Sequence, residues 1–289
     1  MAYSGITEVV KDKVYALHNS LPLDGRLGAY PEKARGFSVC NCYLIKEPEG
    51  AYLLDSGYAS FEKTMIEQLD SLIDRKTPLA IFPLRINELM SVGNALAIAR
   101  TFNVQECYSP AMDVLLWLDL ESAEPGRHMP KIKTNIMRGS LDLDPSGAGR
   151  RPMVGFSAPI RLITTTWIYD KATKTLFSSD MFTHVWSDKA EGPWLIEGDS
   201  DGVTTNAFMR SFLLNTRYWW LDGAATEALA KSVWEVFENY DIECICPGYG
   251  TILKGHKIVE ANFKALTEVL SAMDRSKIKG YYVSRDLIR

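Results

Sequence analysis

The sequence predicts an α/β (α+β) protein, a four-layer αββα sandwich in which helices cover the outer faces of two sheets. Two observations predict this architecture. Short β-prone runs fill two stretches of the chain, and each stretch is followed by segments whose apolar residues recur at helical spacing. With 289 residues, 46% of them hydrophobic, the chain is long enough to bury such a core without disulfides. We expect a single domain over residues 1–289.

The first half of the chain alternates strands with helices. Its β-prone runs are residues 6–10, 14–18, 40–46, 51–55, 78–84 and 104–108. Apolar residues recur at helical spacing over residues 60–74 and again over residues 95–102, which predicts two helices against one sheet face. The polar turn at residues 85–94 joins the buried run to the second helix, so we expect chemistry there.

The second half repeats this arrangement. Its β-prone runs are residues 153–156, 160–165, 167–170, 175–179 and 242–246. Helical spacing covers residues 224–240 and 259–273. One strand in each half ends at an acid, Asp55 and Asp180. Residues 119–151 lack long apolar runs, and we expect them to form an excursion over the surface.

An aromatic insertion at about residues 184–222 interrupts the second half. Its large rings are Trp186, Trp194, Phe208, Tyr218, Trp219 and Trp220. We expect this segment to cover the site like a lid and to offer an apolar or aromatic small molecule a binding surface. Packing in the core or at a dimer interface is the alternative for some of these rings.

Composition excludes several classes of function. The formal net charge of −4 argues against a nucleic-acid surface, and no apolar run approaches the ~20 residues that a membrane-spanning helix needs. The first residues lack the cationic and apolar regions of a signal peptide. The five cysteines lie mostly in apolar runs, which predicts reduced, buried thiols and a cytoplasmic protein.

Separated segments of the chain share one family pattern of strand ends and turns. They are Asn41-Cys42-Tyr43-Leu44-Ile45, Leu53-Leu54-Asp55-Ser56-Gly57, Ser157-Ala158-Pro159, Leu176-Phe177-Ser178-Ser179-Asp180-Met181-Phe182 and Cys246-Pro247-Gly248-Tyr249-Gly250. Together they resemble the metallo-β-lactamase fold, most closely the β-lactamase-like domain of flavodiiron proteins. The resemblance covers about residues 6–273 and implies a head-to-tail homodimer. Because these residues include no flavodoxin domain, we do not expect electron transfer through FMN.

The resemblance also implies two metal ions, bound by the pattern His-x-(His/Glu)-x-Asp-His and by later ligands. The corresponding positions are Ile86, Glu88, Met90, Ser91, Leu162 (Arg161 if the register shifts by one), Asp180 and Tyr249. Among these, carboxylates occur at Glu88 and Asp180, and apolar neighbours penalise a bare cation. We therefore predict no dinuclear metal centre and no cofactor. A single iron or zinc held by Glu88, Asp180 and His184 is the alternative.

The same positions are expected to form a pocket rebuilt for an organic ligand. Candidate catalytic residues are Asp180, Tyr249, Glu88 and His184, since converging carboxylates split their pKa values and a phenol can donate to a substrate oxygen. Candidate substrate-binding residues are Arg85, Arg161, Met90, Leu162, Trp186, Trp194 and Trp219. Each has a structural alternative: ion pairs for the arginines, packing for the aromatic rings, and a solvent-facing loop for His184.

These expectations lead to three functional hypotheses. The first is a metal-independent enzyme, of hydrolase or lyase type, acting on an apolar or aromatic small molecule without nucleic-acid or membrane partners. The second is a non-catalytic binding protein or sensor that uses the same pocket. The third is a residual metalloprotein with one metal ion or a di-iron-like oxygen-binding site.

Overall fold

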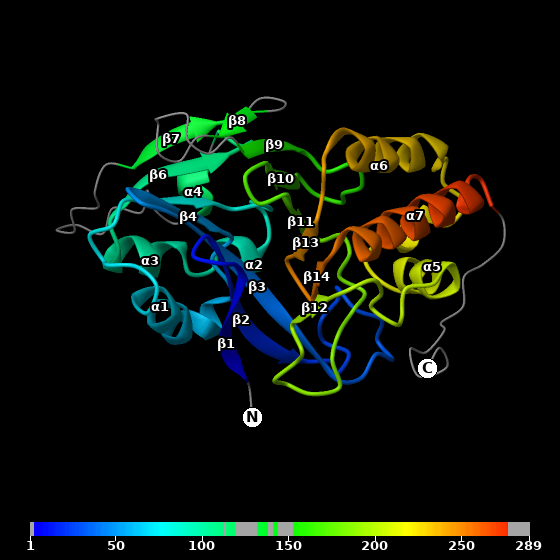
Figure 1. Ribbon diagram of the computed structural model, residues 1–289, viewed down its shortest axis with the longest axis horizontal. Coiled ribbons are helices and arrows are strands. Elements are labelled where there is room, and N and C mark those ends of the chain that lie inside the picture. The colour runs from blue at the N-terminus through cyan, green and yellow to red at the C-terminus, as the bar shows by residue number, and fades with distance from the viewer. Residues whose placement is uncertain (1–2, 113, 119–131, 138–140, 144–152, 277–289) are drawn as a thin grey trace.

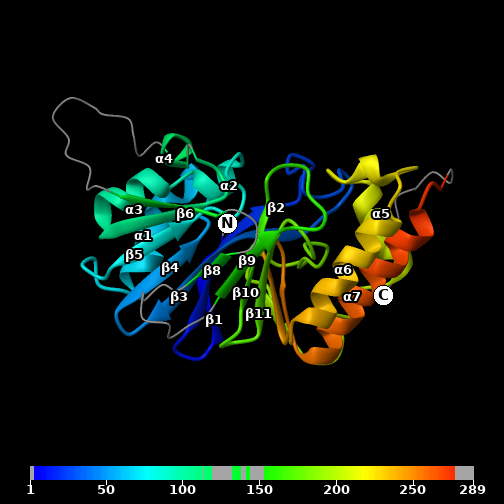
Figure 2. The same cartoon turned by 90° about the horizontal axis from the view of Figure 1, so that it is seen from above.

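The computed structural model describes residues 3–112, 114–118, 132–137, 141–143 and 153–276. Within these ranges, two seven-stranded sheets face each other, and helices cover the outer face of each (Figure 1). The view from above shows the four layers in sequence, with α1 and α3 on one side and α6 and α7 on the other (Figure 2). The predicted αββα sandwich is confirmed.

The first sheet comes from the first half of the chain. Its strands, in spatial order, are β1 (Ser4–Val10), β2 (Val14–Pro22), β3 (Phe37–Glu47), β4 (Gly50–Leu54), β5 (Leu79–Phe82), β6 (Val104–Ser109) and β7 (Lys133–Ile136). Pairing is antiparallel from β1 to β4 and parallel from β4 to β7. The helical elements on this side are η1 (Ala59–Phe61), α1 (Glu62–Asp70), α2 (Leu89–Val92), α3 (Ala95–Thr101) and α4 (Val114–Trp117).

The second sheet comes from the second half. Its strands, in spatial order, are β12 (Leu195–Glu197), β14 (Ile252–Lys254), β13 (Cys244–Pro247), β11 (Thr175–Ser179), β10 (Thr166–Asp170), β9 (Met153–Ser157) and β8 (Leu141–Leu143). Strands β11 and β13 are parallel. The helical elements on this side are α5 (Asn206–Leu214), η2 (Trp219–Leu221), α6 (Glu227–Asn239) and α7 (His256–Met273).

Strand β3 shows why the layers pack as they do. Its side chains alternate between two cores: Tyr43 faces the other sheet, where its ring lies 5.1 Å from that of Phe177, and Leu44 faces the helices. Both faces of β3 are therefore buried, which explains its nearly continuous apolar sequence. No helix in the described ranges is long and apolar enough to cross a membrane.

Several elements differ from the sequence-based predictions, which did not include β7, β8 or β12. The strand predicted over residues 160–165 is wrong: this segment is a loop in which Arg161 and Leu162 are exposed, and Thr165 alone forms a bridge. Strand β14 was not predicted, because it has only three residues. Most of the predicted excursion at residues 119–151 lies outside the described residues, apart from β7 and β8.

The aromatic insertion is built into the outer layer of the second sheet. It contributes β12 to the sheet edge and α5, which contacts α7. Helix α5 begins where Thr205 Oγ1 accepts a hydrogen bond from the Phe208 N–H (3.2 Å), and it buries Phe208 and Phe212. The rings of this helix therefore pack into the core.

Candidate functional site

Five side chains meet where strands of the two sheets end. Arg85 follows β5, Glu88 precedes α2, Asp180 follows β11, and Tyr249 follows β13. Because β4 and β5 are parallel, as are β11 and β13, the residues that follow these strands gather at one edge of each sheet. Arg217, between α5 and η2, joins them from the aromatic insertion. We call Arg85, Glu88, Asp180 and Arg217 the ion cluster.

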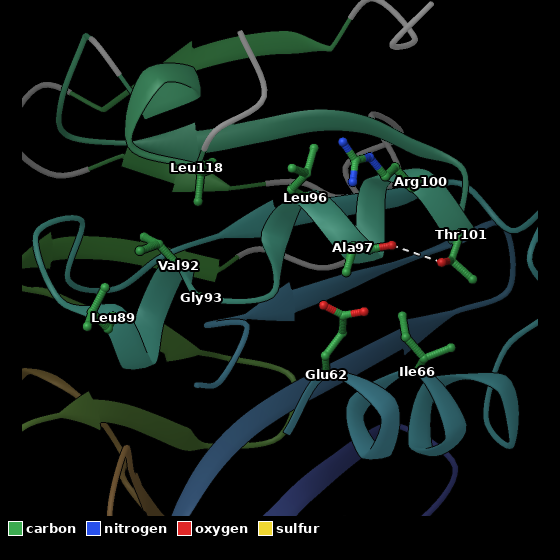
Figure 3. Close-up of a pocket in the computed structure, with 10 residues that line it drawn as sticks. All are labelled: Glu62, Ile66, Leu89, Val92, Gly93, Leu96, Ala97, Arg100, Thr101 and Leu118. Carbon is green, nitrogen blue, oxygen red and sulfur yellow. Dashed lines mark hydrogen bonds between the residues drawn. The ribbon is translucent and has the colours of Figure 1, made fainter. Parts of the chain in front are cut away.

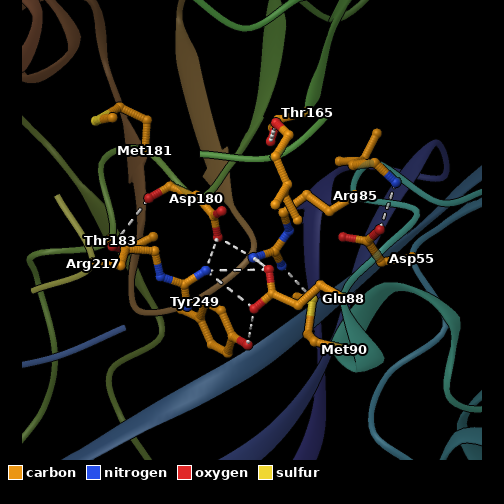
Figure 4. A network of polar contacts seen from close by, with 12 residues as sticks. Asp55, Arg85, Glu88, Met90, Thr165, Asp180, Met181, Thr183, Arg217 and Tyr249 are labelled. Atoms are coloured by element: carbon orange, nitrogen blue, oxygen red, sulfur yellow. Dashed lines mark hydrogen bonds and ion pairs between the residues drawn. The ribbon is translucent and has the colours of Figure 1, made fainter. Parts of the chain in front are cut away.

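The ion cluster consists of two guanidinium groups and two carboxylates in mutual contact (Figure 4). Arg85 Nη1 contacts Asp180 Oδ1 and lies 2.6 Å from Glu88 Oε2. Arg217 Nη1 lies 3.1 Å from Glu88 Oε1 and 3.2 Å from Asp180 Oδ1. Each guanidinium thus bridges both carboxylates, and the four formal charges cancel.

Burial differs within the ion cluster. The Arg85 side chain is fully buried and that of Asp180 is 6% exposed, whereas Glu88 and Arg217 are 20% and 19% exposed. Solvent therefore reaches the cluster from the side of Glu88 and Arg217. In Figure 4 the two arginines approach the carboxylates from opposite sides, with the Tyr249 ring beneath Arg217.

Electrostatics keep both arginines charged. Burial alone would lower the pKa of Arg85, but the carboxylates of Asp180 and Glu88 raise it well above its ordinary value. The same carboxylates raise the pKa of Arg217 against the effect of its burial. Burial raises the pKa of Asp180, although Arg85 and Arg217 act in the opposite direction.

Asp55 lies behind the ion cluster. It is 1% exposed, and its Oδ1 accepts a hydrogen bond from the Leu84 N–H (2.7 Å). Burial raises the pKa of Asp55 to about 6, with Arg85 acting in the opposite direction. This carboxyl therefore fixes the start of the turn that carries Arg85.

Left-handed backbone conformations occur at strand ends around the site. Asp55, Ser179 and Phe182 have φ angles of 61°, 53° and 62°, respectively. Non-glycine residues adopt such angles at a cost that the surrounding structure must offset. Gly250 has φ of 78°, and a Cβ there would lie 2.5 Å from the Val185 carbonyl oxygen, so the turn after Tyr249 requires glycine.

The turn that carries Tyr249 is held by β3. The Asn41 side-chain amide donates to the carbonyl oxygens of Pro247 and Gly250, each at 2.9 Å, and Tyr43 OH donates to the Pro247 carbonyl oxygen at 2.6 Å. These bonds connect the two sheets directly beneath the site. The Asn-x-Tyr pattern in β3 therefore positions Tyr249.

Tyr249 takes part in a chain of hydroxyl groups. Its OH donates to Glu88 Oε1 at 3.4 Å and lies 2.5 Å from the OH of Tyr58. Tyr249 is fully buried and Tyr58 is half-buried. The guanidinium carbons of Arg85 and Arg217 lie 5.3 and 5.9 Å from the centre of the Tyr249 ring, within the range of cation–π attraction.

The ion cluster does not fit a dinuclear metal centre. Its potential ligands are the carboxylates of Glu88 and Asp180, and Arg85 Nη1 already contacts both. At two further ligand positions of the family pattern stand Ile86 and Met90, which are 2% and 0% exposed and offer no oxygen or imidazole. The two guanidinium groups in contact with the carboxylates would also repel a metal ion.

Among the described residues, one set of potential metal ligands lies elsewhere. Asp241, Glu243 and His256 bring their ligand atoms within 4.8 Å of one another. Lys174 already pairs with Asp241 at 2.6 Å and contacts Glu243 at 3.9 Å. These groups belong to a solvated surface and not to the ion cluster.

The structure brings together some of the residues predicted for the site. Arg85, Glu88, Asp180 and Tyr249 converge, and Met90 packs with its sulfur against Arg85 Nη2. These side chains converge because they lie in turns next to the ends of neighbouring strands. Their convergence does not by itself assign them a catalytic role.

Arg161, Leu162 and Trp219 lie at the surface. Arg161 donates from Nη1 to the Ala158 carbonyl oxygen (2.6 Å), and Leu162 and Trp219 are 47% and 68% exposed. Arg161 and Leu162 line a shallow depression of about 520 Å³. Its other lining residues are Asn87, Pro159, Ile160, Ile163, Thr164, Trp220 and Leu229. One lining residue, Asn87, adjoins Glu88 in sequence.

The structure does not bring His184 to the ion cluster. Its Nε2 lies 2.7 Å from Thr204 Oγ1, which donates to Asp201 Oδ2 at 2.6 Å. His184 is 1% exposed, its ring contacts Phe208 and Phe212, and burial lowers its pKa to about 4. It is therefore a neutral core imidazole and neither a solvent-facing residue nor a neighbour of Asp180.

Two of the tryptophans proposed for substrate binding are core residues. Trp186 is 5% exposed, and its Nε1 donates to the Arg35 carbonyl oxygen at 2.8 Å. Trp194 is 4% exposed and donates to the Ala190 carbonyl oxygen at 3.1 Å. Their polar atoms are satisfied within the protein, so the structure assigns them to packing.

Two residues of the site were missed from the sequence. Arg217 is, with Arg210, one of two cations in the aromatic run at residues 208–221, and Tyr58 follows the Asp55-Ser56-Gly57 strand end. A charged residue among apolar ones is itself a signal, because such a group is buried only when it is paired. The sequence offered no means of identifying its partners.

A separate groove lies on the outside of α2 (Figure 3). Its volume is about 440 Å³, and α1, α2 and α3 provide most of its walls. Apolar side chains such as Ile66, Leu89 and Leu96 line it, with Glu62 and Arg100 among them. Helix α2 separates this groove from the ion cluster.

Comparisons with known proteins establish the fold. No family model matches the sequence, and no curated protein matches it. Rubredoxin:oxygen oxidoreductase from Desulfovibrio gigas superposes with a TM-score of 0.66 at 16% identity, over 92% of this chain and 62% of that chain. A mutant flavo di-iron protein from Thermotoga maritima gives 0.65 at 16% identity, over 93% and 62%. A fragment of a diflavin flavoprotein from Nostoc gives 0.64 at 15% identity, over 96% and 97%.

The chain therefore has the metallo-β-lactamase fold, in the form found in the N-terminal domain of flavodiiron proteins. It spans about three fifths of the length of the first two proteins, 62% in each case. At this level of identity the similarity extends to the fold alone. The function has to be argued from the side chains of the site.

Proposed function

We propose that this protein is a metal-independent member of the metallo-β-lactamase fold that binds and transforms an apolar or aromatic small molecule. The observation that carries the proposal is the position of Arg85. Its buried guanidinium contacts both carboxylates that a metal ion would need, Glu88 and Asp180. An arginine side chain keeps its charge at all physiological pH values, so it is a permanent cation at this place.

Acid–base chemistry of hydrolase or lyase type suits the arrangement. Glu88 is the more exposed carboxylate of the ion cluster, and we assign proton transfer to it. The hydroxyls of Tyr249 and Tyr58 extend from Glu88 toward solvent and provide a path for that proton. Asp180 is less exposed and holds Arg85 and Arg217 in place.

A non-catalytic binding protein or sensor is the second candidate. The balanced charge of the ion cluster favours it, because both carboxylates already have cationic partners within the protein. The names of the structural neighbours suggest a third candidate, a di-iron or mononuclear oxygen-binding protein. The carboxylates of Glu88 and Asp180 are too few ligands for such a site, and His184 is hydrogen-bonded to Thr204 instead of lying beside them.

A homodimer and a cytoplasmic location are part of the proposal. The free, buried state of Cys40, Cys42, Cys107, Cys244 and Cys246 is what a reducing compartment favours. Small molecules are the proposed partners, with no role for nucleic acid or a membrane. Sedimentation velocity would test the homodimer: a single species at the mass of one chain contradicts it.

Turnover of a panel of aryl esters and aryl-substituted lyase substrates by metal-stripped protein tests the proposal. We expect turnover to persist in EDTA and to fall about 100-fold in Glu88→Gln. Glu62→Gln, at the outer groove beyond α2, is the matched control and should leave the rate unchanged. Turnover that needs added metal, or that survives Glu88→Gln, contradicts the proposal. Saturable ligand binding without turnover favours the sensor.

A further inference from the structure

Arg217 uses one of its three nitrogen atoms within the ion cluster. Nη1 makes the contacts with Glu88 Oε1, Glu88 Oε2 and Asp180 Oδ1, at 3.1, 3.2 and 3.2 Å. Nε and Nη2 donate to no group in the described part of the chain. The outer edge of this guanidinium, with its three N–H bonds, is therefore unpaired.

This free edge is accessible and fixed in position. The Arg217 side chain is 19% exposed, and neither Nε nor Nη2 belongs to the fully buried unpaired atoms, among which Arg85 Nε does occur. Two carboxylates hold Nη1, and the Tyr249 ring lies 5.9 Å below the guanidinium carbon. Because the group is already ordered, a ligand binds it with little loss of side-chain entropy.

The chemistry of the edge selects a planar anion. Nε and Nη2 present parallel N–H donors at the spacing of the two oxygens of a carboxylate, and they offer no acceptor. A bound carboxylate would lie against Arg217 on the side away from Nη1, so the guanidinium separates it from Glu88 and Asp180. A neutral amide supplies one acceptor oxygen and leaves part of the edge unpaired.

Large apolar side chains follow Arg217 in the sequence. Trp219 is 68% exposed two positions after Arg217, and Trp220 is half-buried and lines the depression with Leu162 and Pro159. A ligand with an aromatic body could pack on these side chains while its charged group binds the arginine.

We propose that the ligand of this site is an aromatic or apolar monocarboxylate, whose carboxylate binds the Nε and Nη2 edge of Arg217. This inference rests on the proposed function, because it assigns a substrate class to the same site. It adds Arg217 to the residues that touch the ligand. It gives the aromatic insertion a role in specificity through one cation and the exposed rings next to it.

Binding of phenylacetate and of 2-phenylacetamide, measured by ligand-observed NMR and calorimetry on the full chain, tests the inference. These probes have nearly the same shape and differ in charge. We expect the acid to bind at least about tenfold more tightly than the amide, as charge-assisted paired bonds require. Equal affinity for the acid and the amide overturns the inference. Absence of binding of both probes at about 10 mM also overturns it, because a fragment that binds an ordered site has a dissociation constant below that concentration.

Substitutions locate the binding group. Arg217→Lys keeps the charge but loses the paired donors, and it should weaken the acid about tenfold; Arg217→Gln should abolish the preference for the acid. Arg26→Lys, at an exposed arginine that pairs with Asp24 outside the site, is the control and should bind like the wild type. Wild-type affinity in Arg217→Lys, or loss of binding in Arg26→Lys, overturns the inference. Circular dichroism confirms that each variant is folded.

The two proposals can fail separately. Absence of carboxylate binding leaves metal content and Glu88-dependent turnover as they were, so the metal-independent function would stand. Stoichiometric metal in the purified protein would overturn that function, whereas Arg217-dependent binding of the acid would stand.

Discussion

Replacing Arg85 with methionine tests how the ion cluster is held together. Methionine fills much of the same volume but removes the charge from a fully buried position. Asp180, which is 6% exposed, then keeps Arg217 as its cationic partner, at 3.2 Å. Breaking a buried ion pair by removing one partner costs about 3–5 kcal/mol, and here the removal leaves one cation against two carboxylates. We expect Arg85→Met to lose that much unfolding free energy at pH 7.

The expected loss of unfolding free energy depends on how deeply the ion pair is buried, so an ion pair at the surface provides the control. Arg26 and Asp24 lie 2.6 Å apart, but the side chain of Arg26 is 81% exposed. Arg26→Met should therefore change the unfolding free energy far less than Arg85→Met does. Urea denaturation followed by tryptophan fluorescence measures both variants under the same conditions.

A double variant isolates the interaction of Arg85 with Asp180. Arg85→Met with Asp180→Asn leaves Arg217 and Glu88 as a balanced pair. We expect its loss to be smaller than the sum of the single losses by at least about 2 kcal/mol. The deficit of Arg85→Met should also shrink as the pH falls, because burial raises the pKa of Asp180 and its protonation removes the excess negative charge. A loss below about 1 kcal/mol for Arg85→Met, or additive losses in the double variant, would refute this reasoning.

Further predictions concern pH, packing and hydroxyl bonds. Burial lowers the pKa of His18 from 6.5 to about 4, so the unfolded chain binds a proton that the fold does not; stability is lost as pH falls from 6.5 to 4. This imidazole should account for about 2 kcal/mol of the unfolding free energy lost between pH 8 and pH 5, and His18→Gln should reduce that loss by the same amount. If the pH dependence of urea unfolding is the same in His18→Gln as in the wild type, this prediction is wrong. Trp186→Ala should cost about 3–5 kcal/mol and Trp219→Ala less than about 0.5 kcal/mol, since they are 5% and 68% exposed; equal losses would contradict the assignment of Trp186 to the core. Tyr249→Phe should cost about 1–2 kcal/mol in thermal or urea unfolding, because its hydroxyl bonds with Tyr58 and Glu88 are lost; a stabilised variant would contradict this.

The fold could be predicted because its signals are local. Strand β3 carries apolar residues on both faces, and the acids Asp55 and Asp180 follow strands in both halves. The loop at residues 160–165 was misassigned, because Ile160 is buried but the β-prone residues after it lie at an exposed turn. The spacing of apolar residues along the sequence does not by itself distinguish an apolar loop from a short strand.

The site could be predicted only in part, because its partners are distant in sequence. Arg85, Glu88, Asp180 and Tyr249 followed from the strand ends, whereas Arg217 reaches them from the insertion. His184 is close to Asp180 in sequence, but the left-handed residue Phe182 between them, with φ of 62°, redirects the chain toward α5. Sequence proximity therefore gave the wrong neighbour for Asp180.

Metal analysis of the full chain, purified without chelators from cells grown with added iron and zinc, tests the central claim most directly. The guanidinium of Arg85 stands in contact with Glu88 and Asp180, and both carboxylates also pair with Arg217. We predict far less than one equivalent of iron or zinc per chain, with no change in Glu88→Ala or Asp180→Ala. Close to one or two equivalents in the wild type, lost in both variants, would contradict the account.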